Sequence, residues 1–233
     1  MRNFAEEMLL KIDAEIESIG FNNDITINDA LHIVKYIIPL YDQLRKLTVD
    51  HIFSSTEEEI YFFKELKPNI LGRYLYFNKV YRIESQCPSG NDVIKEYLND
   101  ELGGLTYFFR RNLELYQYYR SKATTYDTYY FIRGKADIRL CCDSFQCDRD
   151  PMFSTGYDHK IAKILANEML QIYLNKRIIN LGQSEAINKQ AITKIPYPAN
   201  WTSNKIFLIE LGYALYVAGD INNGNITGKE IMN

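Results

Sequence analysis

Apolar residues recur at helical spacing along most of the chain. A first stripe ends at Gly20, and a second covers 30–44, where Pro39 is expected to kink or split the helix. Later stripes at 161–173 and 206–217 predict two further strong helices. The first stripe consists of Phe4, Met8, Leu9, Ile12 and Ile16. Few segments carry strand signals, so the pattern predicts a mainly α protein.

Residues that begin and end helices divide the middle of the chain. Ser55 and Glu58 form a predicted capping box. Pro68 is expected to stop that helix and to open the next one. A further helix is expected from Asp92 to about Lys122, with a bend at Gly103-Gly104.

The pattern changes between Ala123 and Gly156. The aromatic and branched residues Tyr129–Ile132 predict a short strand that Gly134 ends. Because this stretch is typical of a domain junction, we expect two helical domains, 1–125 and 126–233. A helix from Ser154 or Thr155 is expected to break at Gly182–Ser184, and Thr202 or Ser203 is expected to cap the last strong helix.

The C-terminal residues contain a second capping box, Thr227 to Glu230. A capping box opens a helix, yet the sequence continues for only three more residues. Either this segment frays, or the sequence is a C-terminally truncated form of a longer protein, and we favour truncation.

Charge is distributed unevenly behind a net charge of −3. Residues 1–59 carry twelve acids and five bases, whereas 110–139 carry seven bases and three acids. The basic segment also contains many of the 19 tyrosines. Cations neutralise phosphates and tyrosine rings stack on bases, so the pattern fits a nucleic-acid face. Taken alone, this stretch fits better a helix with a solvated basic side and an aromatic side in the core.

No set of residues indicates an active site. The chain has no phosphate-binding glycine loop and no nucleophile elbow. Cys141, Cys142 and Cys147 with His159 lack the paired spacing of a zinc site, and Asp158-His159 is typical of helix capping. We therefore expect no enzyme activity, no metal and no cofactor.

The apolar runs are too short to span a membrane. The N-terminus begins directly in an acidic amphipathic pattern, which argues against a signal peptide. The expected location is the cytoplasm, where the cysteines would be thiols.

Several segments resemble the RteC family. They are Ser55–Pro68, Leu105–Arg120, Phe131–Leu140, Phe153–Asn167 and Trp201–Gly219. The resemblance implies a DNA-binding regulator that activates the excision genes of a tetracycline-inducible conjugative transposon. It also implies two mostly helical domains, with a winged-helix-like, helix-turn-helix motif in the C-terminal one.

Two placements of that motif are open. In the first, Thr202–Gly219 is the supporting helix, Asn222–Asn225 the turn, and Thr227 begins the recognition helix. In the second, Ser184–Ile192 supports Thr202–Gly219 as the recognition helix. We prefer the first, because Thr202–Gly219 is very apolar for a helix in a groove.

The expected partner is double-stranded promoter or operator DNA. Its contacts would be the basic central residues Arg110, Arg111, Arg120, Lys122, Arg133, Lys135 and Arg139, and the C-terminal residues Lys189, Lys194, Ser203, Asn204, Lys205 and Lys229. The alternative is a helical protein-interaction module, in which the acidic N-terminal region binds RNA polymerase or a second copy of the chain.

Overall fold

The structure is a computed structural model that describes residues 1–20, 25–134, 150–193 and 204–218. The described residues form helices and turns and contain no strand. The helices are α1 (Arg2–Ser18), α2 (Ile27–Val49), α3 (Thr56–Tyr61), η1 (Phe62–Leu66), α4 (Lys67–Gln86), α5 (Asn91–Arg111), α6 (Leu113–Arg120), α7 (Asp127–Tyr130), α8 (Tyr157–Thr193) and α9 (Lys205–Ala218). The mainly α class is thereby confirmed.

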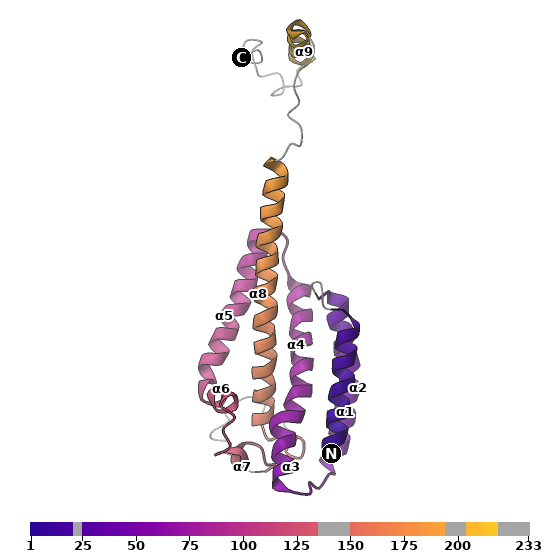
Figure 1. Cartoon of the computed structure of the whole chain (residues 1–233), viewed down its shortest axis with the longest axis vertical. Coiled ribbons are helices and arrows are strands. Elements are labelled where there is room, and N and C mark those ends of the chain that lie inside the picture. The colour runs from indigo at the N-terminus through magenta and orange to yellow at the C-terminus, as the bar shows by residue number, and fades with distance from the viewer. Residues whose placement is uncertain (21–24, 135–149, 194–203, 219–233) are drawn as a thin grey trace. The chain divides into compact units, whose positions relative to one another are not determined.

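The chain divides into two compact units, Met1–Ser184 and Glu185–Asn233. In the first unit, α4 lies between α2 and α8, and α5 lies on the other side of α8 (Figure 1). Residues 126–184 fall in this first unit. The domain boundary expected near residue 125 stays a prediction.

Side-chain caps fix the starts of two helices. The Thr26 hydroxyl accepts from the Asp29 N–H at 3.2 Å, and Asp29 accepts from the Thr26 N–H at 3.0 Å, a complete capping box for α2. Ser55 caps α3 as expected, because its hydroxyl accepts from the Glu58 N–H at 3.2 Å. The Glu58 carboxylate, however, accepts from Ser54 rather than Ser55, so the predicted box is only half formed.

Pro68 does not stop the helix before it. α3, η1 and α4 follow one another without a break, and Pro68 lies in the first turn of α4. The link is a π-helical turn in which the Lys67 N–H bonds to the Phe62 carbonyl, five residues earlier. Since Pro68 has no N–H to donate, a wider turn immediately before it lets the helical path continue.

Two other expected breaks do not occur. α2 is not split at Pro39, and α8 runs through Gly182–Ser184. α5 includes Gly103-Gly104, and the bend expected there, like a kink at Pro39, stays a prediction. The helix expected to reach Lys122 is instead interrupted at Asn112, between α5 and α6. The expected strand at Tyr129–Ile132 is wrong as well, because α7 occupies Asp127–Tyr130.

One hydrophobic core joins the helices of the first unit. Ile37 from α2, Phe63 from η1 and Ile161 from α8 are fully buried in it. Gly72 sets the approach of α4 to α8, since a Cβ there would lie 3.3 Å from the Ala162 carbonyl oxygen and the Leu165 Cβ. Any larger residue at position 72 would push the two helices apart.

A buried ion pair between Lys67 and Asp158 also connects α4 to α8. The Lys67 ammonium donates to the Phe153 carbonyl at 2.6 Å and lies 4.1 Å from the Phe153 ring centroid. The second Asp158 oxygen accepts from the Gly156 N–H at 3.0 Å and the His159 N–H at 2.8 Å. Both charges are therefore compensated where water is excluded. Burial lowers the pKa of Lys67, and Asp158 opposes that shift.

We expect Lys67→Met to destabilise the fold by about 3–5 kcal/mol, because it leaves the Asp158 carboxylate buried without its counter-charge. The double variant Lys67→Met/Asp158→Asn should recover much of that loss, since the amide oxygen still accepts from the backbone N–H groups. Urea unfolding of both variants measures the difference. A double variant no more stable than the single one would show that the unpaired charge is not the cause.

Candidate nucleic-acid interface

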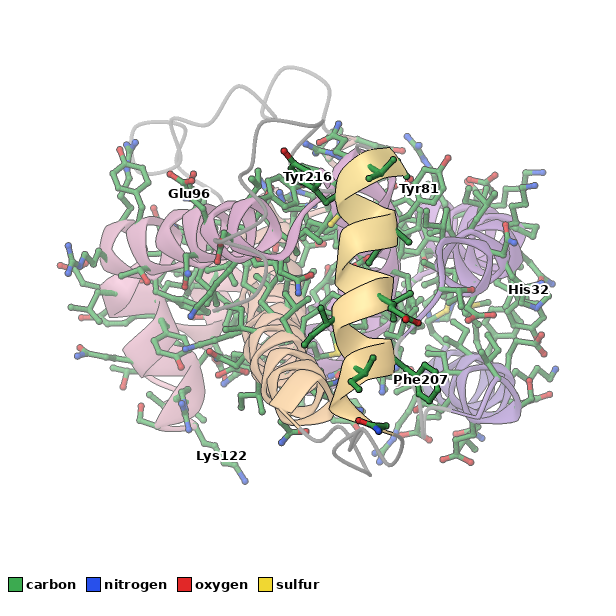
Figure 2. All side chains as sticks on the ribbon, turned by 90° about the horizontal axis from the view of Figure 1, so that it is seen from above. His32, Tyr81, Glu96, Lys122, Phe207 and Tyr216 are labelled. Atoms are coloured by element: carbon green, nitrogen blue, oxygen red, sulfur yellow. The ribbon has the colours of Figure 1, made fainter. Side chains whose placement is uncertain are left out.

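Four exposed cations lie at the ends of α5 and α6. Arg110 and Arg111 form the last turn of α5, Arg120 ends α6, and Lys122 follows it. Figure 1 places the end of α5 beside α6 and α7, and Figure 2 shows Lys122 extending away from the helices. Cations are favoured at these helix ends by the unpaired carbonyl groups there.

Two of these arginines pack on a tyrosine one helical turn earlier. Arg111 donates to the Tyr107 hydroxyl at 3.2 Å, with its guanidinium 5.7 Å from the ring centroid. Arg120 donates to the Tyr116 hydroxyl at 2.9 Å, with its guanidinium 5.6 Å from that ring. The bond to Tyr116 raises the pKa of Arg120. Arg120 also forms an ion pair with Glu168 at 3.7 Å. Both guanidinium groups keep further N–H donors that could bind a phosphate.

Lys122 ends α6 in a left-handed backbone conformation. Its φ is 54°, and it is the position that a glycine usually takes after a helix. The Lys122 N–H bonds to the Tyr119 carbonyl at 3.1 Å, and the Ala123 N–H bonds to the Tyr118 carbonyl at 3.2 Å. This pair of bonds is a Schellman motif. The motif directs the chain away from α6 and leaves the ammonium exposed.

Arg133 belongs to the interior of the fold rather than to an exposed face. Its side chain is 14% exposed and forms an ion pair with Glu59 at 2.8 Å. It also donates to the carbonyls of Thr48, His51 and Met152 at 3.1–3.3 Å. These bonds tie the end of α2 and the start of α3 to the segment before α8, so we assign Arg133 a structural role.

The other predicted contacts are described only in part. Lys135, Arg139, Lys194, Ser203 and Lys229 lie outside the described residues. Lys189 and Lys205 lie in the helical backbone of α8 and α9, with no description of their side chains. Asn204 is exposed, and its side-chain oxygen accepts from the Ile206 N–H at 3.2 Å at the start of α9.

Tyrosines of the basic segment support the fold as well as the surface. The Tyr118 hydroxyl donates to Asp127 at 2.8 Å, beside the buried ion pair that Asp127 forms with Lys64. Burial, followed by the bond to Asp127, raises the pKa of Tyr118 to about 12. Tyr119 donates to Glu65 at 3.1 Å in the same region. The aromatic side of this segment is therefore largely core, as the second interpretation of the pattern expected.

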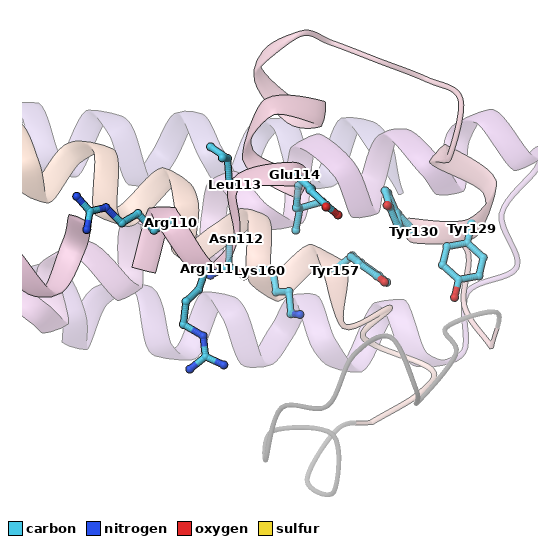
Figure 3. Close-up of a pocket in the computed structure, with 10 residues that line it drawn as sticks. Arg110, Arg111, Asn112, Leu113, Glu114, Tyr129, Tyr130, Tyr157 and Lys160 are labelled. Carbon is cyan, nitrogen blue, oxygen red and sulfur yellow. The ribbon is translucent and has the colours of Figure 1, made fainter. Parts of the chain in front are cut away.

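Sequence reasoning missed a pocket beside Arg110 and Arg111. It has a volume of about 560 Å³ and is also lined by Tyr157 and Lys160 at the start of α8 (Figure 3). These residues are far apart in the sequence, and only the packing of α8 against the end of α5 brings them together. The basic charge of the segment was the only signal that pointed toward this region.

The described residues contain no group of three or more His, Cys, Asp or Glu side chains able to hold a metal ion. Cys141, Cys142 and Cys147 lie outside them. Within the part of the chain that the structure describes, no helix has both the length and the apolar character to cross a membrane.

The fold and the site define a helical protein with a group of exposed cations at the ends of α5 and α6. The family model for RteC protein matches residues 61–233, which is most of the chain, and the chain belongs to this family. Membership suggests a regulator connected with conjugative transposons. No curated protein and no solved structure matches the chain.

We expect Arg133→Gln to destabilise the fold by about 2–4 kcal/mol, because it leaves Glu59 without its counter-charge and backbone carbonyls without a donor. Arg110→Gln is a matched control, since Arg110 is exposed and should change stability by less than about 0.5 kcal/mol. Thermal unfolding followed by circular dichroism measures both. Equal stability of the two variants would show that Arg133 does not stabilise the fold.

Proposed function

We propose that the protein is a DNA-binding transcriptional regulator that activates the excision genes of a conjugative transposon. It acts in the cytoplasm on double-stranded promoter or operator DNA. The observation that carries the proposal is the set of exposed cations at the ends of α5 and α6, in a protein of the RteC family. Exposed arginine and lysine side chains bind the phosphate backbone and position a protein on the duplex.

Base readout belongs to a winged-helix-like motif in the C-terminal part of the chain. The described side chains of α9 favour the placement in which α9 is the supporting helix of this motif, because Ile206, Phe207 and Ile209 are apolar and exposed. Such residues suit a helix that packs on another helix better than one that reads polar base edges. The recognition helix then begins at Thr227, outside the described residues.

Removing the cations of α5 and α6 should weaken DNA binding and its salt dependence together. We expect Arg110→Gln/Arg111→Gln/Arg120→Gln to reduce the slope of log affinity against log salt by about 0.9 for each phosphate that the variant no longer neutralises. Fluorescence anisotropy with a duplex from the element's promoter region, against a scrambled duplex, measures this. Arg82→Gln/Lys95→Gln is the control, because both residues are exposed cations away from these helix ends.

The proposal fails if the chain does not prefer the promoter duplex over the scrambled one at moderate salt. It also fails if the triple variant and the control variant have the same slope. A preserved preference with a reduced slope is the expected result, since phosphate contacts set affinity while base contacts set specificity.

Lys122→Gly separates the charge of Lys122 from its effect on folding. Glycine adopts positive φ without strain, so we expect the free energy of unfolding to stay unchanged or to rise by up to about 1 kcal/mol. DNA affinity should fall nonetheless, because glycine has no ammonium to bind a phosphate. Urea unfolding and anisotropy on the same preparation test both statements. An unchanged DNA affinity would exclude Lys122 from the interface.

A protein-interaction module is the second candidate function, and α9 favours it. Phe207, Leu211 and Val217 are exposed by 55%, 47% and 79%, although they are large and apolar. Exposed apolar side chains gathered on one helix are typical of surfaces that bind another protein. Sedimentation of the intact chain distinguishes the two candidate functions. The second function would be favoured if the chain self-associates, if Phe207→Lys abolishes that self-association, and if the chain does not bind DNA.

A further inference from the structure

The pocket beside α5 has the lining of a ligand site. It lies where the end of α5, the start of α6, α7 and the first turn of α8 meet, and Asn112 and Glu114 contribute polar groups to it (Figure 3). Its volume of about 560 Å³ is within the range of pockets that bind small molecules.

The described lining is positively charged. Arg110, Arg111 and Lys160 line the pocket together with the single carboxylate of Glu114. Arg111 comes from α5 and Lys160 from α8, and Figure 3 shows their side chains extending toward the same side of the pocket. Arg110 extends away from them. The charge and the planar guanidinium of Arg111 favour an anion with several oxygens, above all a phosphate.

Three tyrosines form the aromatic part of the pocket. The rings of Tyr130 and Tyr157 have centroids 4.3 Å apart and planes inclined by 34°, and Tyr129 lies 6.3 Å from Tyr157. Aromatic surfaces of this kind bind planar rings by stacking. A ligand that combines a phosphate with a planar ring would use both parts of the lining.

The Tyr129 hydroxyl supplies an independent observation. It is buried, yet it has no hydrogen-bond partner among the described residues. A buried hydroxyl without a partner costs free energy, and such groups are rare in folded proteins. Tyr129 is among the residues that line the pocket, so an oxygen of a bound ligand that reaches its hydroxyl would give this group its missing partner.

We propose that this pocket binds a small organic phosphate of nucleotide size. The phosphate lies against Arg111 and Lys160, and the ring lies against the tyrosines. This site does not depend on the proposed DNA binding, although Arg110 and Arg111 belong to both surfaces. Free nucleotide and DNA backbone offer the same phosphate chemistry, so the experiment measures them separately.

The test uses adenosine monophosphate as the probe and the intact chain in a calorimetric titration. We expect binding, with adenosine at least tenfold weaker because it lacks the phosphate. Arg111→Gln should weaken binding about tenfold or more, because the variant cannot offer a charged hydrogen-bond donor. Arg82→Gln is the matched control, since this exposed arginine on α4 does not line the pocket, and it should leave binding unchanged.

Tyr129→Phe separates binding from folding. It removes only a hydroxyl that has no partner in the described structure, so the unfolding temperature should stay the same or rise. Binding of adenosine monophosphate should weaken about two- to tenfold, the effect of one hydrogen bond. A merely structural role of Tyr129 would lower the unfolding temperature and leave the affinity unchanged, which would count against the proposal.

The proposal is overturned if adenosine monophosphate does not bind at millimolar concentration, or if Arg111→Gln binds it as well as the parent chain does. A loss of DNA affinity in Arg111→Gln without nucleotide binding would assign these cations to DNA alone. Nucleotide binding without DNA binding would support the pocket and contradict the proposed function instead.

Discussion

The buried ion pair between Lys67 and Asp158 determines where α8 begins. Lys67 lies just after the π-helical turn, and Asp158 lies in the first turn of α8. The ammonium also bonds to the Phe153 carbonyl, so the segment before α8 is held at the same point. A buried charge tolerates few arrangements, because any shift of one partner leaves the other without compensation. The start of α8 is therefore fixed more strictly than apolar packing alone would fix it.

Other contacts depend on this position. Arg133 reaches the Met152 carbonyl in the segment before α8, and Arg45 forms an ion pair with Asp150 at 3.4 Å. Farther along α8, Glu84 of α4 accepts from Arg177 at 3.0 Å. Tyr157 and Lys160 can line the pocket beside α5 only because the first turn of α8 is held in place. The structural ion pair and the candidate ligand site thus use neighbouring residues in the first turn of α8.

The fold class and most helices could be predicted from apolar periodicity, whereas their interruptions could not. Pro68 is an obvious stop signal for a helix. A π-helical turn just before it lets the helix continue although proline has no N–H to donate, and no local sequence pattern indicates that turn. The aromatic run at Tyr129–Ile132 has a strand-like composition, yet the described residues offer no partner strand and its rings pack on Tyr118 and Tyr157 instead. At Tyr129–Ile132, tertiary contacts overrode the local preference.

In the candidate site, too, the sequence predicts features that depend on neighbouring residues but not those that depend on residues far apart in the chain. Basic residues close together in the sequence predicted the cations Arg111 and Arg120, and their exposure follows from helical periodicity. The burial of Arg133 does not follow, because it depends on Glu59 and on carbonyls of residues about eighty positions away. A buried arginine donates hydrogen bonds to backbone carbonyls, and an exposed arginine donates hydrogen bonds to a phosphate. Both use the same guanidinium N–H groups. Composition therefore identifies a basic segment, and only the packing decides which of its cations remain available to a ligand.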